Sequence, residues 1–372
     1  MPTDRMRVIY VSTLEHGGPV SHMHALAERV SALGVDVRIV GPHDVGVRSK
    51  WDVRGALGLW PLLAGADVVH THDRRAGLFA RVLAKARGAK VVHTYHGLPE
   101  EIAVELGRDD GYRDPSVSPL RRTWLRGGYL RIEAALALLG AVVVPSEAMA
   151  SYLAACGVPR SRLRVIPSGV DVVRAAPSPT LHDPPVVAVM ANLERWKGVD
   201  VLLDACGTHL HAGRTHLHAG GMHVDVYGDG RERDALEAQA ARLGSAGVDV
   251  TFHGHVPGAR ERVAATADVV VVPSRAENLP MAALEAMAAA LPVVGTRVGG
   301  MPELVEDGVT GIVVPPDDPG AMAAAIDKVL SDDTLRVAMG TAGAARVAAR
   351  FSAGGVARQL VDLYEELCGT AR

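Results

Sequence analysis

The chain has 372 residues, a formal net charge of −3, and 48% hydrophobic but only 4% aromatic residues. This length suits two domains, and the weak charge and scarcity of aromatic rings argue against nucleic-acid binding. Three scattered cysteines, Cys156, Cys206 and Cys368, exclude a disulfide framework and a paired-cysteine zinc site. No apolar run is long enough to span a bilayer, so we expect a cytoplasmic protein.

Short β-branched runs alternate with Ala- and Leu-rich stretches of helical period, which is the pattern of a parallel sheet covered by helices. In the first half the runs are RVIYVS, VDVRIVG, ADVVHTH, KVVHTYH, AVVVPS and RVIPSG. The second half repeats the pattern with PVVAVMANL, HVDVYGDG, VTFHGHV, ADVVVVPS, PVVGTRVGG and TGIVVPP. This α/β pattern predicts two doubly wound domains, residues 1–175 and 176–355, facing each other across a cleft. The Pro-rich stretch 173–185 reads as their linker.

The first predicted strand leads into Glu15-His16-Gly17-Gly18-Pro19. Two glycines just before a helix leave backbone N–H groups and the positive helix end open to a phosphate. An ordinary strand-to-helix turn is an equally good interpretation. Neither this loop nor GDGRERD in the second half has the full dinucleotide fingerprint, so NAD or FAD binding has little support.

Four histidines stand at predicted strand ends: His70 and His72 in VVHTHD, and His93 and His96 in VVHTYHG. Open α/β sheets hold their ligands at the carboxyl ends of strands. His96, followed by Gly97, is best placed to project toward a ligand. A structural hydrogen-bonding role is the alternative for each of them.

Residues 117–131, VSPLRRTWLRGGYLR, mix Arg121, Arg122, Arg126 and Arg131 with Leu, Trp and Tyr. This composition suits the interface of an anionic membrane. A surface helix packed on its own domain, with its arginines in solvent, is the alternative. From this stretch alone both interpretations stay open, and the first of them would mean peripheral contact with the inner membrane face.

In MANLERWKG, Arg195 and Lys197 come just after a strand and at a helix start. Cations at a helix start are unfavourable because they oppose the positive end of the helix dipole. Their presence therefore suits an anionic ligand, which both the cations and the helix amides can bind.

Further on, THLHAGR and THLHAGG repeat in tandem and carry closely spaced histidines: His209, His211, His216 and His218, with His223 following. Their i, i+2 spacing puts neighbours on different helix faces, so we interpret the repeat as a duplicated surface loop rather than a metal site.

The stretch SRAENLPMAALEAMAAALPVVG contains two carboxylates, Glu277 and Glu285. Pro280 is expected in the first turn of a helix through Met281 to Ala290, with Glu277 in the preceding loop. Glu285 then lies among Ala, Leu and Met, where an unpaired carboxylate is expensive to bury. It needs donors, and the hydroxyls of a ligand would serve.

Taken in order, GGPVSH, HTYHG, VVVPSEAMASYL, VIPSGVD, NLERWKG, VYGDGRERDAL, ENLPMAALE and GGMPELVEDGVTGIVVPPDD cover nearly the whole chain. Together they resemble the retaining GT-B glycosyltransferases of family 4, also called glycosyl transferases group 1. The resemblance implies a nucleotide-diphosphate sugar held by the C-terminal domain and an acceptor held by the N-terminal one. It also implies retention of configuration without metal or cofactor, and a last helix, 356–372, packed back on the first domain.

The resemblance assigns catalytic roles to His96, Lys197 and Glu277, with the diphosphate on Lys197 and the transferred sugar on Glu277 and His96. Glu285 would bind the donor ribose. The donor-binding set that it implies is Gly17, Gly18, Asn192, Arg195, Lys197, Gly228, Asn278, Leu279, Met281 and Glu285.

Three positions depart from the family pattern: Asn192 replaces a common Arg, Pro280 replaces a common Gly, and Ser168 replaces the usual Asn before Gly-Val-Asp. Arg195 is a candidate substitute for the missing cation. The departures keep open a catalytically impaired nucleotide-sugar-binding module, and a nucleotide-sugar 2-epimerase is a further alternative. HTHDRRAG and HTYHG are similar to transferases acting on polyisoprenyl-linked sugars, so the expected acceptor is a lipid-linked or cell-surface glycan, as in polysaccharide biosynthesis.

Overall fold

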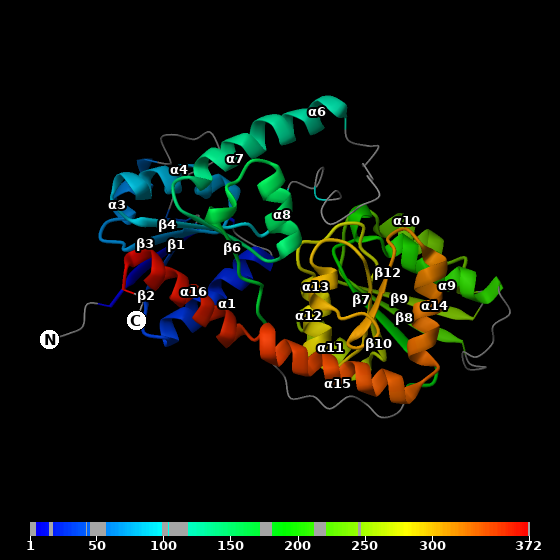
Figure 1. Ribbon diagram of the computed structural model, residues 1–372. Helices are drawn as coiled ribbons and strands as arrows, with labels where there is room; N and C mark the ends of the chain where they lie inside the picture. Colours follow the sequence, from blue (N-terminus) through cyan, green and yellow to red (C-terminus); the bar gives the residue numbers. More distant parts are fainter. Residues whose placement is uncertain are drawn as a thin grey trace. The chain divides into compact units, whose positions relative to one another are not determined.

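The computed structural model describes residues 5–14, 18–41, 43–44, 57–98, 103, 118–171, 181–211, 221–244 and 247–370. They divide into two compact units (Figure 1). Among the described residues, the first contains the chain up to Gly169 except Ala103, together with the C-terminal part from Ala353 onward, and the second contains Ala103 and Val170–Ser352. Most of the linker expected at 173–185 lies outside the described residues.

A six-stranded parallel sheet forms the centre of the first unit, in the order β2-β1-β3-β4-β5-β6. Its strands are β1 (Arg7–Val11), β2 (Asp36–Val40), β3 (Val68–Thr71), β4 (Lys90–Thr94), β5 (Ala141–Val144) and β6 (Leu163–Val165). β1, β3, β4 and β5 are Val-rich and almost entirely buried, as expected for strands covered on both faces. The strand order reverses between β1 and β3, which marks the point where such sheets bind ligands.

Helices cover both faces of this sheet. They are α1 (Gly18–Ala32), α3 (Leu59–Leu62), α4 (Arg74–Ala86), α6 (Pro119–Trp124), α7 (Leu130–Ala137), α8 (Glu147–Ala155) and α16 (Ala353–Cys368). A π-helical segment, Leu125–Tyr129, joins α6 to α7, and a 3-10 turn, Arg160–Arg162, precedes β6.

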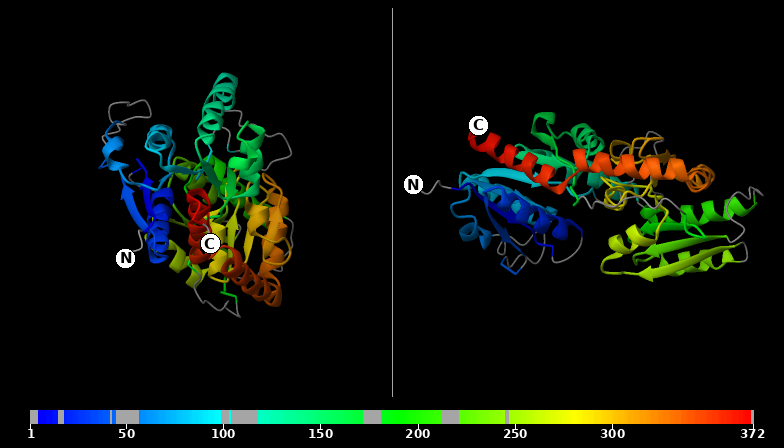
Figure 2. Two further views of the ribbon diagram at one scale, coloured as in Figure 1. Left: turned by 60° about the vertical axis from the view of Figure 1, so that its left-hand side comes forward. Right: turned by 90° about the horizontal axis from the view of Figure 1, so that it is seen from below.

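The C-terminal helix α16 is part of the first unit's core. It lies along α1, as both views of Figure 2 show. Its apolar side, including Val356, Leu360 and Tyr364, packs with β1 residues Val8 and Tyr10. The last segment of the chain thus completes the core of the first unit.

The second unit is built on another six-stranded parallel sheet, in the order β12-β11-β10-β7-β8-β9. Its strands are β7 (Val186–Met190), β8 (Met222–Tyr227), β9 (Val248–Gly254), β10 (Val269–Val272), β11 (Val293–Thr296) and β12 (Gly311–Val314). The order reverses between β7 and β10. Each of the two units therefore has a doubly wound sheet, and the predicted fold class is confirmed.

The second unit's helices are α9 (Val199–His211), α10 (Arg233–Ala240), α11 (Ala259–Thr266), α12 (Met281–Ala288), α13 (Met301–Leu304), α14 (Pro319–Leu330) and α15 (Asp333–Arg350), with a 3-10 turn η3 (Arg195–Lys197). Two apolar clusters, one on each face of the sheet, hold them in place.

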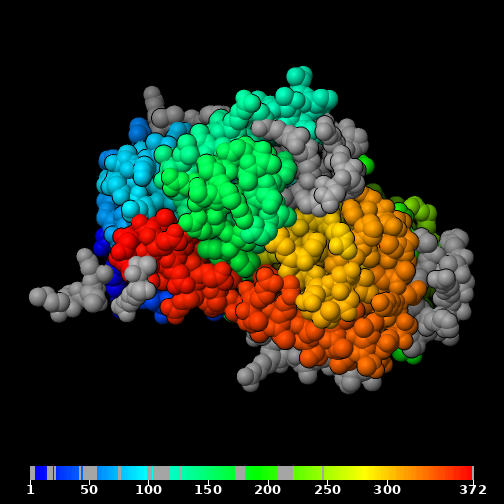
Figure 3. Space-filling model, in the orientation of Figure 1, coloured from blue at the N-terminus to red at the C-terminus, as the bar shows by residue number. Residues whose placement is uncertain are grey.

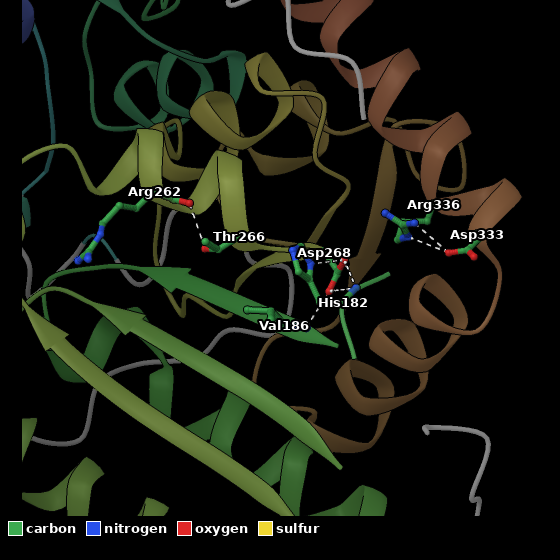
Figure 4. A network of polar contacts seen from close by, with 7 residues as sticks. All are labelled: His182, Val186, Arg262, Thr266, Asp268, Asp333 and Arg336. Carbon is green, nitrogen blue, oxygen red and sulfur yellow. Dashed lines mark hydrogen bonds and ion pairs between the residues drawn. The ribbon is translucent and has the colours of Figure 1, made fainter. Parts of the chain in front are cut away.

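Polar contacts fix where β7 begins (Figure 4). The buried Asp268 carboxylate accepts the backbone N–H of Val186 at 2.8 Å and lies 3.0 Å from Nδ1 of His182. Because Asp268 immediately precedes β10, these bonds align the starts of the two strands that flank the switch point. The loops after both strands therefore emerge side by side.

One predicted boundary is wrong in detail. Pro280 is the N-cap of α12, with φ −73° and ψ 107°, and not a member of its first turn. The helix also ends at Ala288, because Ala290 adopts a left-handed φ of 58°. Glu285 lies inside α12 as expected.

Candidate active site

The turn after β7 carries Lys197. A left-handed Gly198 (φ 66°) ends η3, and a Cβ at this position would lie 2.1 Å from the carbonyl oxygen of Pro273. Only glycine allows this approach, which sets the Lys197 turn against the loop that follows β10. The ammonium of Lys197 lies 4.2 Å from the ring centre of Trp196.

Arg275 ties the two loops together. Its guanidinium makes a two-pronged contact with Asp200 at 2.8 Å per bond, donates to the carbonyl of Arg195 at 2.7 Å, and contacts Asp317. Its backbone N–H donates to the carbonyl of Trp196 at 2.8 Å. A planar guanidinium is suited to such a fork, so the loops are held as one rigid support.

Glu277 is the acidic centre of this support. Its carboxylate is 8% exposed, and Nζ of Lys197 lies 2.5 Å from its Oε1. The hydroxyl of the buried Ser274 donates to the same oxygen at 2.8 Å. No hydrogen bond among the described residues reaches Oε2, which leaves that oxygen as the acceptor that a ligand hydroxyl can use.

The backbone around Glu277 is equally constrained. Gly299 has a φ of 52°, and a Cβ there would lie 1.7 Å from the carbonyl oxygen of Glu277. The neighbouring Gly300 donates its N–H to the carbonyl of Asn278 at 2.8 Å. The turn after β11 therefore packs directly beneath the Glu277 loop and holds its backbone in position.

Helix α12 begins beside this loop. Its N-cap, Pro280, supplies no side-chain hydrogen bond to the first turn. An uncapped helix N-terminus is a site where an anion is stabilised by backbone N–H groups. The side chain of Leu279 is buried, so that residue would meet a ligand only through its backbone.

Glu285 lies one turn into α12 and is half-buried. Burial raises the pKa of its carboxyl, which the positive charge of Arg260 on α11 partly offsets. No described residue donates a hydrogen bond to it. The Glu285 carboxylate thus has no hydrogen-bond donor among the described residues, and its position among apolar residues in the sequence led us to expect that it needs donors from a ligand.

The remaining predicted donor residues of this unit lie around the same loops. Asn192 and Arg195 are exposed in the turn after β7. Gly228, with φ 129°, follows β8, and a Cβ there would lie 1.8 Å from the carbonyl oxygen of Ala191. The predicted donor residues of the second unit thus lie in the turn after β7, in the loop after β10, in α12, and, for Gly228, against the turn after β7.

Strand-end histidines of the first unit gather at its own switch point. His72, after β3, and His96, after β4, approach to 3.2 Å between Nδ1 and Nε2. His70 stacks on His72 with 4.2 Å between ring centres. Burial lowers the pKa of His96 to about 3 and that of His72 well below its ordinary value, with further lowering by neighbouring histidines. These rings are therefore neutral at physiological pH.

His93 behaves differently from its neighbours. It points to the opposite face of the sheet, where its Nδ1 lies 2.7 Å from Oγ1 of Thr71. Beneath it, the buried ion pair of Arg81 and Glu133 joins α4 to α7 at 2.6 Å. This histidine is a structural group.

Some predicted residues lie outside the described part. Gly17 is one of them, whereas Gly18 is the first residue of α1. The side chains of most of the histidine repeat also lie outside it, except that His223 on β8 contacts Asp225 at 3.1 Å. Among the described residues, no group of three or more His, Cys, Asp or Glu side chains is arranged to hold a metal ion.

Sequence reasoning missed three polar residues with clear roles in these sites: Ser274, Arg275 and Tyr364. Ser274 and Arg275 stand within three residues of Glu277, a proximity that could have drawn attention to them. Tyr364 hydrogen-bonds His70 at 2.6 Å from 294 residues away, and no local pattern reveals such a contact.

The chain thus has two doubly wound sheets, with a Lys–Glu pair at one switch point and neutral histidines at the other. Residues 16–174 match the family described as Glycosyltransferase Family 4, and residues 184–332 match Glycosyl transferases group 1. The chain is 30% identical over 314 residues to the D-inositol 3-phosphate glycosyltransferase of Corynebacterium urealyticum, covering 81% of this chain and 72% of that protein.

Solved structures share the fold. Sucrose-phosphate synthase from Thermosynechococcus elongatus superposes with a TM-score of 0.76 at 24% identity, covering 99% of this chain and 100% of that one. Anabaena HepE in complex with UDP-glucose gives 0.74 at 19% identity, with 97% and 100% covered. The chain belongs to the group 1, or family 4, glycosyltransferases, and it is a glycosyltransferase.

Proposed function

We propose that this glycosyltransferase moves a sugar from a nucleotide-diphosphate sugar to its acceptor with retention of configuration. The observation that carries the proposal is the Lys197–Glu277 pair at the switch point of the second unit, beside the uncapped N-terminus of α12. The cation and the helix amides suit a diphosphate, and the open Oε2 of Glu277 suits a sugar hydroxyl. UDP-glucose in the similarly folded HepE supports this donor class.

In this proposal each group has one task. Lys197 and the α12 amides stabilise the charge that grows on the diphosphate as the glycosidic bond breaks. Glu285 accepts from the ribose diol, Glu277 from the transferred sugar, and His96 contacts that sugar near the reacting carbon. The departing phosphate takes the acceptor's proton on the same face, so no protein nucleophile is needed and configuration is retained.

The ribose assignment predicts a specific loss. Glu285→Ala should weaken binding of a nucleoside diphosphate by about 1.5–3 kcal/mol, because the diol loses a charged acceptor. Isothermal calorimetry with UDP, GDP and ADP measures this. Burial raises the Glu285 pKa, so this carboxylate becomes protonated at a higher pH than an ordinary glutamate does. As the pH falls, nucleotide binding by the wild type should therefore begin to weaken at that higher pH.

Glu277→Ala is the matched control. It should leave binding of the bare nucleoside diphosphate intact, because Lys197 loses only a competing partner, while turnover of the sugar donor falls. Equal losses of nucleotide affinity in both variants would reject the division of tasks.

Product formation separates the proposal from its alternatives: a nucleotide-sugar-binding module gives no transfer with any acceptor, and a 2-epimerase gives the epimeric nucleotide sugar.

We further propose that the reaction needs no metal, since Lys197 and the α12 amides supply the positive charge that a divalent ion provides elsewhere. Turnover should therefore be unchanged in excess EDTA when measured by release of the nucleoside diphosphate. Loss of turnover that magnesium restores would contradict this proposal.

The acceptor is proposed to be a lipid-linked or cell-surface glycan intermediate, met at an anionic membrane face. The observation that favours it is the α6–α7 segment at the molecular surface, in teal in Figure 3. Leu120 and Trp124, one turn apart on α6, are 85% and 49% exposed, and Arg121 on α6 and Arg131 on α7 are also exposed. Large apolar side chains among cations suit an interface in which the apolar groups enter the lipid. No helix in the described part of the chain has the length and apolar composition needed to cross a bilayer.

Flotation with liposomes tests the membrane contact. The protein should float with anionic but not with neutral vesicles at low salt, because each cation near the surface contributes about 1 kcal/mol. Arg121→Glu with Arg122→Glu should abolish flotation. Arg160→Glu with Arg162→Glu, the same charge change at an exposed turn of the same unit, should not. If the two double variants float equally well, the α6–α7 segment does not bind the membrane, and the acceptor would be a soluble one.

A further inference from the structure

The position of the proton on His96 follows from its contact with His72. The two side chains leave neighbouring strands of the first unit, and Nδ1 of His72 lies 3.2 Å from Nε2 of His96. Their rings lie nearly parallel, at 25° with 5.5 Å between centres. Both rings are neutral, so one nitrogen donates and the other accepts. Two arrangements of the protons satisfy this hydrogen bond.

The second nitrogen of His72 distinguishes between them. His72 is 2% exposed, and its Nε2 is buried with no hydrogen-bond partner among the described residues. If His72 accepted from His96, its own proton would sit on Nε2 as a buried N–H without an acceptor. Such orphaned donors are rarer in folded proteins than acceptors that lack a donor. The favoured arrangement therefore has Nδ1–H of His72 donating to Nε2 of His96.

The ring of His72 is itself held in place. His70 stacks on it at 4.2 Å, and both nitrogens of His70 have hydroxyl partners, Tyr364 on Nδ1 and Thr94 on Nε2, each at 2.6 Å. Tyr364 is further bonded to Tyr10 at 3.0 Å. Because both ring nitrogens of His70 are engaged, its plane is fixed, and the stacked ring of His72 has little freedom to turn.

We propose that His72 is a positioning residue that keeps His96 in the tautomer protonated on Nδ1. The lone pair on Nε2 of His96 is then occupied by His72, and the ring proton of His96 is on Nδ1. An effect on turnover rests on the proposed contact of His96 with the transferred sugar, whereas the tautomer itself does not.

Two substitutions of nearly equal shape test the proposal. In His72→Asn, the amide nitrogen can take the place of Nδ1 as donor, whereas His72→Asp offers only acceptors there. In ¹⁵N spectra of the ring nitrogens, His96 should be protonated on Nδ1 in the wild type and in His72→Asn. In His72→Asp it should be protonated on Nε2 or on both nitrogens. Steady-state rates should stay near wild type for Asn and fall about 10- to 100-fold for Asp, with nucleoside diphosphate affinity unchanged.

The outcomes separate the inference from the proposed function. A wild-type His96 protonated on Nε2, or one whose tautomer is the same in folded His72→Asp, overturns the inference. If His72→Asp does not fold, the wild-type spectrum alone decides it. Full turnover by His96→Ala would instead overturn the proposed sugar contact and leave the tautomer assignment standing.

Discussion

Lys197→Met is expected to lower kcat about 10²- to 10³-fold while changing donor affinity much less. Charge on the diphosphate grows only as the glycosidic bond breaks, so a cation beside it acts mainly in the transition state. Methionine keeps an unbranched stem over Trp196 but removes the charge that lies 2.5 Å from Glu277. Pre-steady-state rates, with donor Kd from calorimetry, separate the two effects.

Arg195→Ala is the informative comparison for this experiment. Arg195 is an exposed cation in the same turn, two residues before Lys197, and it is the proposed substitute for the Arg that Asn192 replaces. We expect its removal to lower kcat comparably. A fully active Arg195→Ala enzyme would show that position 192 needs no substitute, and a Lys197→Met enzyme that loses only affinity would remove Lys197 from the transition state.

Glu133→Gln is expected to destabilise the first unit by about 3–5 kcal/mol, because it leaves Arg81 as a buried charge without its counterion. The two side chains are 1% and 3% exposed and join α4 to α7. Native-state hydrogen exchange of peptides from α4 and α7 measures the change locally. This is preferable to a single melting temperature, since a chain of two units need not unfold in one step.

Glu147→Gln provides the matched control. Glu147 pairs with Arg160 at 2.5 Å, close to the distance of the buried pair, but the two side chains are 56% and 54% exposed. Solvent screens such a pair, so the substitution should change stability by no more than about 1 kcal/mol. A similar loss in both variants would mean that burial does not set the strength of these ion pairs.

The strands were predictable because buried parallel strands are continuous β-branched runs, and every run identified in the sequence overlaps one of the observed strands. The end of α12 was not predictable, since Ala288, Ala289 and Ala290 all favour helix. The chain leaves the helix there because Ala290 takes a left-handed conformation before Leu291, which packs into the core.

The candidate site divides in the same way. The positions of Glu277 before a helix and Glu285 within it were predictable, because Pro280 indicates a helix start and this signal depends only on neighbouring residues. The order of strands in the sheet brings Lys197 and Glu277, 80 residues apart, within 2.5 Å. Neighbouring strands likewise join His72 to His96, and the return of α16 to the first unit joins Tyr364 to His70. Periodicity and capping act over a few residues and can be read from the chain, but these partners are set by strand order and core packing, which exist only in the folded protein.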